Sequence, residues 1–116
     1  MSRISTHILD LSRGTPAAGV RVELHRLAEG LREAVAEAVT TVDGRTPAPL
    51  LSASDDPGGV FELVFHAGDY FRALGLPLTD PPFLDQVVIR FGVAAGVAYH
   101  VPLLLSPYGY STYRGS

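Results

Sequence analysis

Several residue types are absent from this chain of 116 residues, and each absence excludes a class of protein. Cysteine is missing, so neither a disulfide nor a thiolate metal site can hold the fold. Lysine is missing too: all nine basic side chains are arginine, twelve side chains are acidic, and the net charge is −3. Because a mildly acidic chain without a basic cluster is a poor nucleic-acid binder, we expect no nucleic-acid partner.

Long hydrophobic runs are also absent. The longest apolar stretches, residues 93–99 and 101–105, fall far short of the roughly 20 residues that a membrane span needs. The segment that starts at Met1 has no apolar run of the length found in signal peptides. We therefore expect no membrane partner and a cytoplasmic location.

Apolar residues, in contrast, are abundant. They make up 47% of the chain against 18% charged residues, which excludes intrinsic disorder, and the mean hydropathy of +0.21 is high for so small a chain. The length predicts one domain, residues 1–116, with no linker or repeat. A domain of this size buries only roughly two thirds of its unfolded surface, so we expect apolar surface to remain for a partner subunit.

Turn-forming residues divide the chain into short pieces. Twelve glycines and nine prolines are spread throughout, which is typical of an all-β domain. Apolar and polar residues alternate between these turns, and the pattern predicts about seven or eight strands in a β-sandwich, the clearest being 3–10, 20–25, 60–66, 86–93 and 97–105. One short helix is predicted, with Asp69 as its N-cap and Gly75 in the left-handed position after its end.

Two segments are harder to interpret. Residues 31–42 carry an apolar stripe with helical spacing, yet alternate positions also fit one face of a strand, so periodicity leaves both alternatives open. Residues 45–59 are rich in Pro, Ser, Asp and Gly and are predicted to be a loop.

Strand geometry groups the polar side chains that interrupt the apolar pattern. Ser5 and His7 share one face of the first predicted strand, and Ala98, His100 and Pro102 share one face of the late strand. Because proline cannot donate to a ladder, Pro102 predicts an edge position or a bulge.

The four histidines are the candidates for acid–base chemistry. A neutral imidazole can accept a proton near pH 7, so His7 or His100 could be a general base, although a hydrogen-bonded structural histidine is the commoner case. His25 and His66 are predicted to be surface or rim residues. No metal-binding spacing, phosphate loop or dinucleotide fingerprint is present, so we expect no metal and no cofactor.

An arginine in a turn and the aromatic tail complete the candidates. Arg45 follows an Asp-Gly pair; it is either a solvated loop charge or a guanidinium that binds a planar polar ring through paired hydrogen bonds. In the last nine residues an extended backbone would put Arg114 and Ser116 on one face, and Ser116 would present a carboxylate ionised at neutral pH. An ordinary edge strand is the alternative.

Five sequence blocks in this order resemble the transthyretin-related family of 5-hydroxyisourate hydrolases, from the first strand to the last residue. They are STHILD at 5–10, GTPAAG at 14–19, TVDGR at 41–45, YHVPLLLSP at 99–107 and YSTYRGS at 110–116. The YRGS ending behind HVPLLLSP is the most specific of them, because transthyretin itself lacks it. The resemblance implies a transthyretin-like two-sheet β-sandwich of about eight strands with one short helix, and therefore a strand within 31–42.

The resemblance also implies an assembly, an activity and a site. The family forms homotetramers, as dimers of dimers, with active sites in the central channel, and hydrolyses 5-hydroxyisourate in urate degradation without a cofactor. Its catalytic positions fall on His7, Arg45 and His100, and its substrate-binding tail on Tyr113, Arg114 and Ser116, with the role of Tyr113 the least defined. The family often has histidine where this chain has Ala98. A transthyretin-like carrier that binds an aromatic ligand without chemistry is the alternative function.

Overall fold

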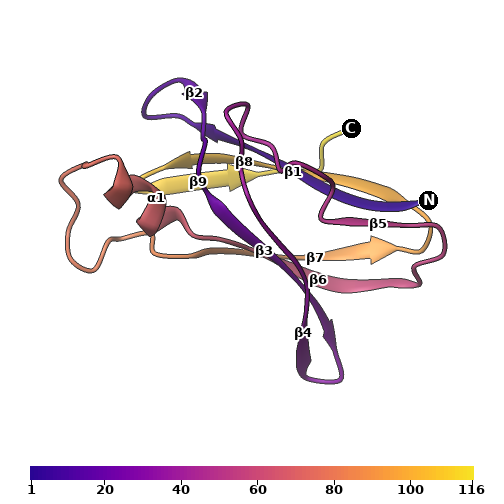
Figure 1. Cartoon of the computed structure of the whole chain (residues 1–116). Helices are drawn as coiled ribbons and strands as arrows, with labels where there is room; N and C mark the ends of the chain where they lie inside the picture. The colour runs from indigo at the N-terminus through magenta and orange to yellow at the C-terminus, as the bar shows by residue number, and fades with distance from the viewer.

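Two β-sheets lie face to face, with one short helix at one end of the sandwich, in the computed structural model, which describes residues 1–116 (Figure 1). The strand order is β2–β1–β8–β9 in one sheet, where β5 also pairs with β1, and β4–β3–β6–β7 in the other. The elements are β1 (Ser2–Asp10), β2 (Thr15–Pro16), β3 (Arg21–Ala28), β4 (Leu31–Val39), β5 (Leu51–Ala53), β6 (Gly58–Phe65), α1 (Ala67–Ala73), β7 (Val87–Ala94), β8 (Ala98–Ser106) and β9 (Gly109–Thr112). The predicted all-β sandwich is confirmed. No helix has the length and apolar character that a membrane crossing requires.

The hydrophobic core fills the space between the sheets. On β1, Ile4 and Ile8 are fully buried, whereas Ser5 and His7 on the opposite face are only half-buried, as the alternation predicts. The largest fully buried side chains are Phe61, Phe65, Phe71, Ile4, Ile8, Leu24, Leu63, Leu103 and Leu105. The residues of β1 that face away from this core are thus available to build a site on the outer face of the first sheet.

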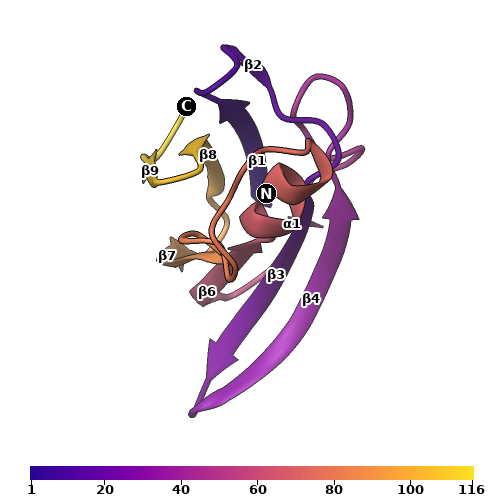
Figure 2. The same cartoon turned by 90° about the vertical axis from the view of Figure 1, so that its left-hand side faces the viewer.

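The ambiguous segment 31–42 contains a strand, as the resemblance implies. β4 pairs with β3 along its whole length, and a tight turn with positive φ at Glu29 (53°) and Gly30 (76°) joins the two strands. β3 pairs with β6 on its other side, so β4 completes the backbone hydrogen bonding of β3, which a helix could not do. The β3–β4 hairpin extends beyond the rest of the sandwich (Figure 2).

Two predictions about local structure need correction. The predicted loop 45–59 contains the short strand β5 and the start of β6, both of which form through pairing with distant strands. The helix begins at Ala67, so Asp69 is not its N-cap; that position is held by His66, whose side chain makes no capping hydrogen bond. Asp69 pairs instead with Arg72, at 2.9 Å, whereas Gly75 has the predicted positive φ of 76° after the helix.

A buried hydrogen bond ties helix α1 to the end of β1. The hydroxyl of Tyr70 donates to Oδ2 of the buried Asp10 over 2.7 Å, and the backbone N–H of Ser12 donates to Oδ1 of the same carboxylate. Burial, followed by the hydrogen bond to Asp10, raises the pKa of Tyr70 to about 12. The tyrosine therefore stays protonated and keeps its donor at any physiological pH.

The prediction for His66 is wrong, because this side chain is buried rather than exposed at the surface. Its Nε2 donates to Oε2 of Glu23 over 2.5 Å, while Nε2 of the half-buried His25 donates to the other carboxylate oxygen over 3.0 Å. The hydrogen bond from His66 is the largest of the effects that lower the pKa of Glu23. These contacts join the start of α1 to β3 and give both histidines a structural role.

The lowered pKa of Glu23 predicts a stability that depends on pH. A carboxylate whose pKa is lower in the folded than in the unfolded state stabilises the fold at pH values above its ordinary pKa of 4.5. This contribution is lost as the pH falls through the folded-state pKa. We expect Glu23→Gln to lower the free energy of unfolding at pH 7 by about 1 kcal/mol, as measured by urea denaturation.

The difference between the variant and the parent should shrink at pH 3.5. Glu33→Gln is the matched control, because Glu33 is exposed on β4 and has no charged partner within 4.0 Å, so it should change little at either pH. Equal destabilisation by Glu23→Gln at both pH values would contradict an ionic origin of the effect.

Candidate active site

The parallel pairing of β1 with β8 brings the two ends of the sequence together. Their register sets Ser5 opposite His100, and His7 opposite Pro102. Side chains at paired positions of neighbouring strands point to the same face. The two candidate histidines, 93 positions apart in the sequence, therefore lie on the same outer face of the first sheet.

The turn that precedes Arg45 is held against β1 by its backbone. Gly44 accepts a hydrogen bond from the N–H of Ile8 over 2.9 Å, and Arg45 forms an isolated antiparallel bridge with His7. Gly44 has a φ of 77°, and a Cβ there would come within 2.4 Å of the Ile8 carbonyl oxygen and 3.2 Å of Cδ2 of His7. Only glycine lets this turn pack against the imidazole.

The side chain of Asp43 stabilises the same turn by hydrogen bonds within it. Asp43 accepts hydrogen bonds from the Thr41 hydroxyl, over 2.5 Å, and from the backbone N–H of Arg45, over 3.2 Å. These bonds, with the Thr41 hydroxyl the stronger influence, lower the pKa of Asp43. The Asp-Gly-Arg turn thus fixes the backbone of Arg45 whether or not a ligand is bound.

The tail reaches the second histidine by a separate route. Strand β9 ends at Thr112, and the chain continues beside β8, where the N–H of Gly115 donates to the carbonyl oxygen of His100 over 2.7 Å. A Cβ on Gly115 would lie 2.7 Å from Cδ2 of His100. Each of the two imidazoles therefore packs against a glycine from a segment far away in the sequence.

Pro102 does not lie on an edge strand, but it lies just outside the ladder that β8 forms with β9. β8 lies inside its sheet, between β1 and β9. The carbonyl oxygen of Pro102 accepts a hydrogen bond from the Thr112 hydroxyl over 2.7 Å, and the β8–β9 ladder begins one residue later, at Leu103. A single missing N–H is tolerated here because neighbouring residues carry the pairing.

A polar pocket of about 330 Å³ opens on this face. It is lined by Arg3, Ser5, Arg45, Ala98, Tyr99, His100 and Ser116. His7 lies beside it, joined to Arg45 by the backbone bridge. The pocket thus brings together Arg45, His100 and Ser116 of the predicted site.

Burial and neighbouring groups lower the pKa of His100 and favour its neutral form. Burial is the largest influence that lowers its pKa, followed by the positive charge of Arg45 and by His7. The hydroxyl oxygen of Ser5 lies 2.9 Å from its Nδ1. At neutral pH the pocket therefore presents an uncharged imidazole beside a guanidinium.

Some arginines form ion pairs within the fold, whereas others line the polar pocket without a carboxylate partner. Five of the nine have a carboxylate within 4.0 Å, and these are Arg21, Arg26, Arg32, Arg72 and Arg90. Arg3 and Arg45 have no such partner, and both line the polar pocket. Their free guanidinium groups can bind the oxygens of an electron-rich or anionic ligand.

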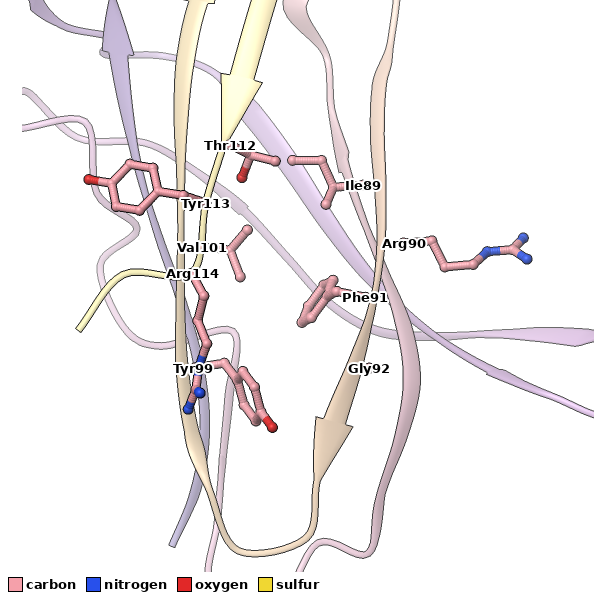
Figure 3. A pocket seen from close by; sticks show the side chains of 9 residues that line it. All are labelled: Ile89, Arg90, Phe91, Gly92, Tyr99, Val101, Thr112, Tyr113 and Arg114. Atoms are coloured by element: carbon pink, nitrogen blue, oxygen red, sulfur yellow. The ribbon is translucent and has the colours of Figure 1, made fainter.

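The rest of the predicted tail lies elsewhere. Tyr113 and Arg114 line a second, mainly apolar pocket of about 300 Å³ between β7, β8 and the end of β9 (Figure 3). The guanidinium carbon of Arg114 lies 4.4 Å from the centre of the Tyr99 ring, a cation–π contact. Arg114 and Ser116, which an extended backbone would put on one face, line different pockets.

Four residues that line the pocket were not among the predicted site residues: Arg3, Ser5, Ala98 and Tyr99. Arg3 and Ser5 share the face of His7 on β1, so alternation alone could have included them. Their proximity to His100 depends on the register with β8, which the sequence does not reveal. No group of three or more histidine or carboxylate side chains is arranged to hold a metal ion.

Comparisons with known proteins match the chain over nearly its whole length. Residues 4–115 match the model of the HIUase/Transthyretin family. A 5-hydroxyisourate hydrolase of Pseudomonas aeruginosa is 53% identical, over 100% of this chain and 93% of that protein. Another, from Mesorhizobium japonicum, is 54% identical, over 98% of this chain and 92% of that protein.

Solved structures agree with this similarity. The 5-hydroxyisourate hydrolase of Klebsiella pneumoniae is 41% identical, with a TM-score of 0.82 over all of both chains. An (S)-allantoin synthase is 40% identical, with a TM-score of 0.90 over 99% of this chain, which spans only 44% of that longer protein. Sea bream transthyretin, solved with thyroxine, is 27% identical, with a TM-score of 0.83 over 97% of this chain and 94% of that one.

The contact of Gly115 with His100 leads to a structural prediction. In Gly115→Ala the new methyl group must displace either the tail or the imidazole. We expect the amide of residue 115 to lose at least tenfold of its protection against hydrogen exchange, and the His100 ring signals to shift in NMR spectra. Gly109→Ala is the matched control, since a Cβ there meets nothing closer than 3.8 Å. Unchanged protection and ring signals in Gly115→Ala would contradict the packing.

Proposed function

The chain belongs to the HIUase/Transthyretin family, and we propose that its polar pocket is the active site in which it hydrolyses 5-hydroxyisourate. The product is 2-oxo-4-hydroxy-4-carboxy-5-ureidoimidazoline, and the reaction is a step of urate degradation. The observation that carries the assignment of the site is the convergence of Arg45, His100 and Ser116 on one pocket, with His7 beside it. We also propose that residues 1–116 form one domain and that the protein is cytoplasmic.

Hydrolysis of a cyclic amide needs three things from the protein. A base must take a proton from water, a cationic or N–H group must stabilise the oxygen that becomes negative, and the planar ring must be held in place. His7 and His100 are the groups available for proton transfer at neutral pH. Arg45, which has no carboxylate partner, is placed to hold ring carbonyl oxygens and the developing charge.

The bond changes follow from these roles. Water loses a proton to an imidazole, and its oxygen attacks the C6 carbonyl carbon of the substrate. The carbonyl electron pair moves to oxygen, beside Arg45. When the carbonyl re-forms, the C6–N1 bond breaks and N1 takes the proton from the imidazolium. The new acid ionises at neutral pH.

The tail is proposed to orient the substrate. Ser116 lines the polar pocket, whereas Tyr113 and Arg114 lie in the neighbouring apolar pocket. Tyr99 lines both pockets, and the cation–π contact of Arg114 with its ring connects them. Within one protomer, Arg114 and Tyr113 therefore act on the site through Tyr99 and the path of the tail.

We propose that the enzyme is a homotetramer, a dimer of dimers. The outer strands β7 and β9 of the two sheets have free edges on the same side of the sandwich, flanking the apolar pocket (Figure 2). Free edges expose unpaired backbone N–H and carbonyl groups, which a second copy can pair. Tyr110 on β9 is also exposed in the single protomer. Such an assembly would enclose the polar pockets in a central channel.

A carrier function is the alternative. The sea bream transthyretin structure holds thyroxine, and its fold is similar to this one. The greater identity, 53–54% against 27%, is with proteins named as hydrolases. The two histidines and the free guanidinium beside them also favour chemistry, because a carrier does not require a group that takes a proton from water.

The first test removes each imidazole. We expect His7→Asn and His100→Asn to lose at least 100-fold of the rate of 5-hydroxyisourate decay, since acid–base catalysis contributes about 10²–10⁴-fold. Decay is followed by ultraviolet absorbance with substrate made freshly from urate by urate oxidase. His25→Asn is the matched control, because this imidazole contacts Glu23 on the other sheet and should leave the rate unchanged. Full activity in both site variants would rule out the assignment.

The second test removes residues 114–116. The deletion takes away the backbone partner of His100 and the Ser116 side of the pocket. We expect kcat/KM to fall by at least 100-fold while the oligomeric state, measured by light scattering, stays the same. If turnover matched that of the full chain, the tail would be a structural element only.

A further inference from the structure

The central strands of the first sheet hold one contact that the proposed chemistry has not used. Oγ of Ser5 lies 2.9 Å from Nδ1 of His100, and the two residues are register partners in the β1–β8 ladder. Both strands are interior to the sheet, so backbone pairing on two sides fixes their spacing. The contact is therefore built into the fold and does not depend on a mobile loop.

Counting donors and acceptors favours one of the two possible arrangements of this hydrogen bond. A neutral imidazole carries one N–H, so Nδ1 either donates to the serine oxygen or accepts from it. Ser5 Oγ has no other protein partner within hydrogen-bond distance. If Nδ1 donated, the hydroxyl proton of Ser5 would have no acceptor in the protein. If Ser5 donates, its only donor and the Nδ1 lone pair are both satisfied.

We propose that Ser5 is a positioning residue that donates to Nδ1 of His100 and keeps the imidazole proton on Nε2, so that His100 donates a hydrogen bond to the substrate and His7 is the general base. This inference rests on the proposed function and divides the work between the two histidines. Nε2–H of His100 and the guanidinium of Arg45 then hold the carbonyl oxygen as it becomes negative.

The charges around His100 support this division. A general base must become an imidazolium, and burial together with the positive charge of Arg45 disfavours a second positive charge on His100. A neutral imidazole that donates from Nε2 is not penalised in this way. His7 is joined to the turn through its backbone, and its ring packs against Gly44. It is the remaining imidazole that can take the proton from water.

The tautomer can be measured without substrate. In protein labelled with ¹⁵N-histidine, long-range ¹H–¹⁵N correlation spectra at pH 8 distinguish protonated from unprotonated ring nitrogens. His100→Asn assigns the signals by their loss. We expect Nε2 of His100 to be protonated and Nδ1 unprotonated, and the reverse pattern would overturn the proposal. Because no turnover is involved, this result is independent of whether the protein hydrolyses 5-hydroxyisourate.

Two variants test the role of the hydroxyl itself. Ser5→Ala should shift the Nδ1 signal toward its protonated value and lower kcat about tenfold with KM within twofold, whereas Ser5→Thr, which keeps the hydroxyl, should restore both. Ser2→Ala is the matched control: it removes a hydroxyl from the same strand, one that bonds to Asp56 and Gly96 away from the pocket. Unchanged ring signals and kcat in Ser5→Ala would overturn the positioning role.

Discussion

The parallel pairing of β1 with β8 is the constraint on which the rest of the structure depends. It joins residues 95 positions apart, and its inner side contributes Ile4, Ile8 and Leu103 to the buried core. The same register places Ser5 and His100 side by side on the outer surface. The inner face of the paired strands β1 and β8 thus belongs to the core, and their outer face belongs to the site. A register slip of one residue would expose the apolar side chains and bury the polar ones.

The site adds short backbone contacts to this ladder. The turn before Arg45 and the end of the tail each form an isolated bridge to a histidine, and each brings a glycine against the imidazole. Backbone hydrogen bonds position these segments more rigidly than side chains alone could. The catalytic machinery that we propose is therefore held in place mainly by main-chain geometry, with side chains left free for the ligand.

Local patterns in the sequence were sufficient for the features that depend on side-chain direction alone. The faces of β1 and the position of Gly75 after the helix follow from alternation and from backbone sterics. Residues 31–42 were ambiguous because helical and strand spacings coincide there, and pairing with β3 decides between them. His66, the N-cap of α1, is buried and bonds to Glu23 of β3, a contact between segments distant in the sequence. Ser5 became part of the site only through its register with β8.

The division of the arginines has a long-range consequence. The protein carries a net charge of −3, yet the guanidinium groups that lack a carboxylate partner include the two that line the polar pocket. Electron-rich oxygens of a ligand would thus meet two guanidinium groups at this opening, beside the terminal residue Ser116. Such an attraction accelerates encounter and weakens beyond a Debye length of about 8 Å at physiological ionic strength. Nearby carboxylates compensate the charge of the five paired arginines, so Arg3 and Arg45 are the arginines that can supply this attraction at the pocket.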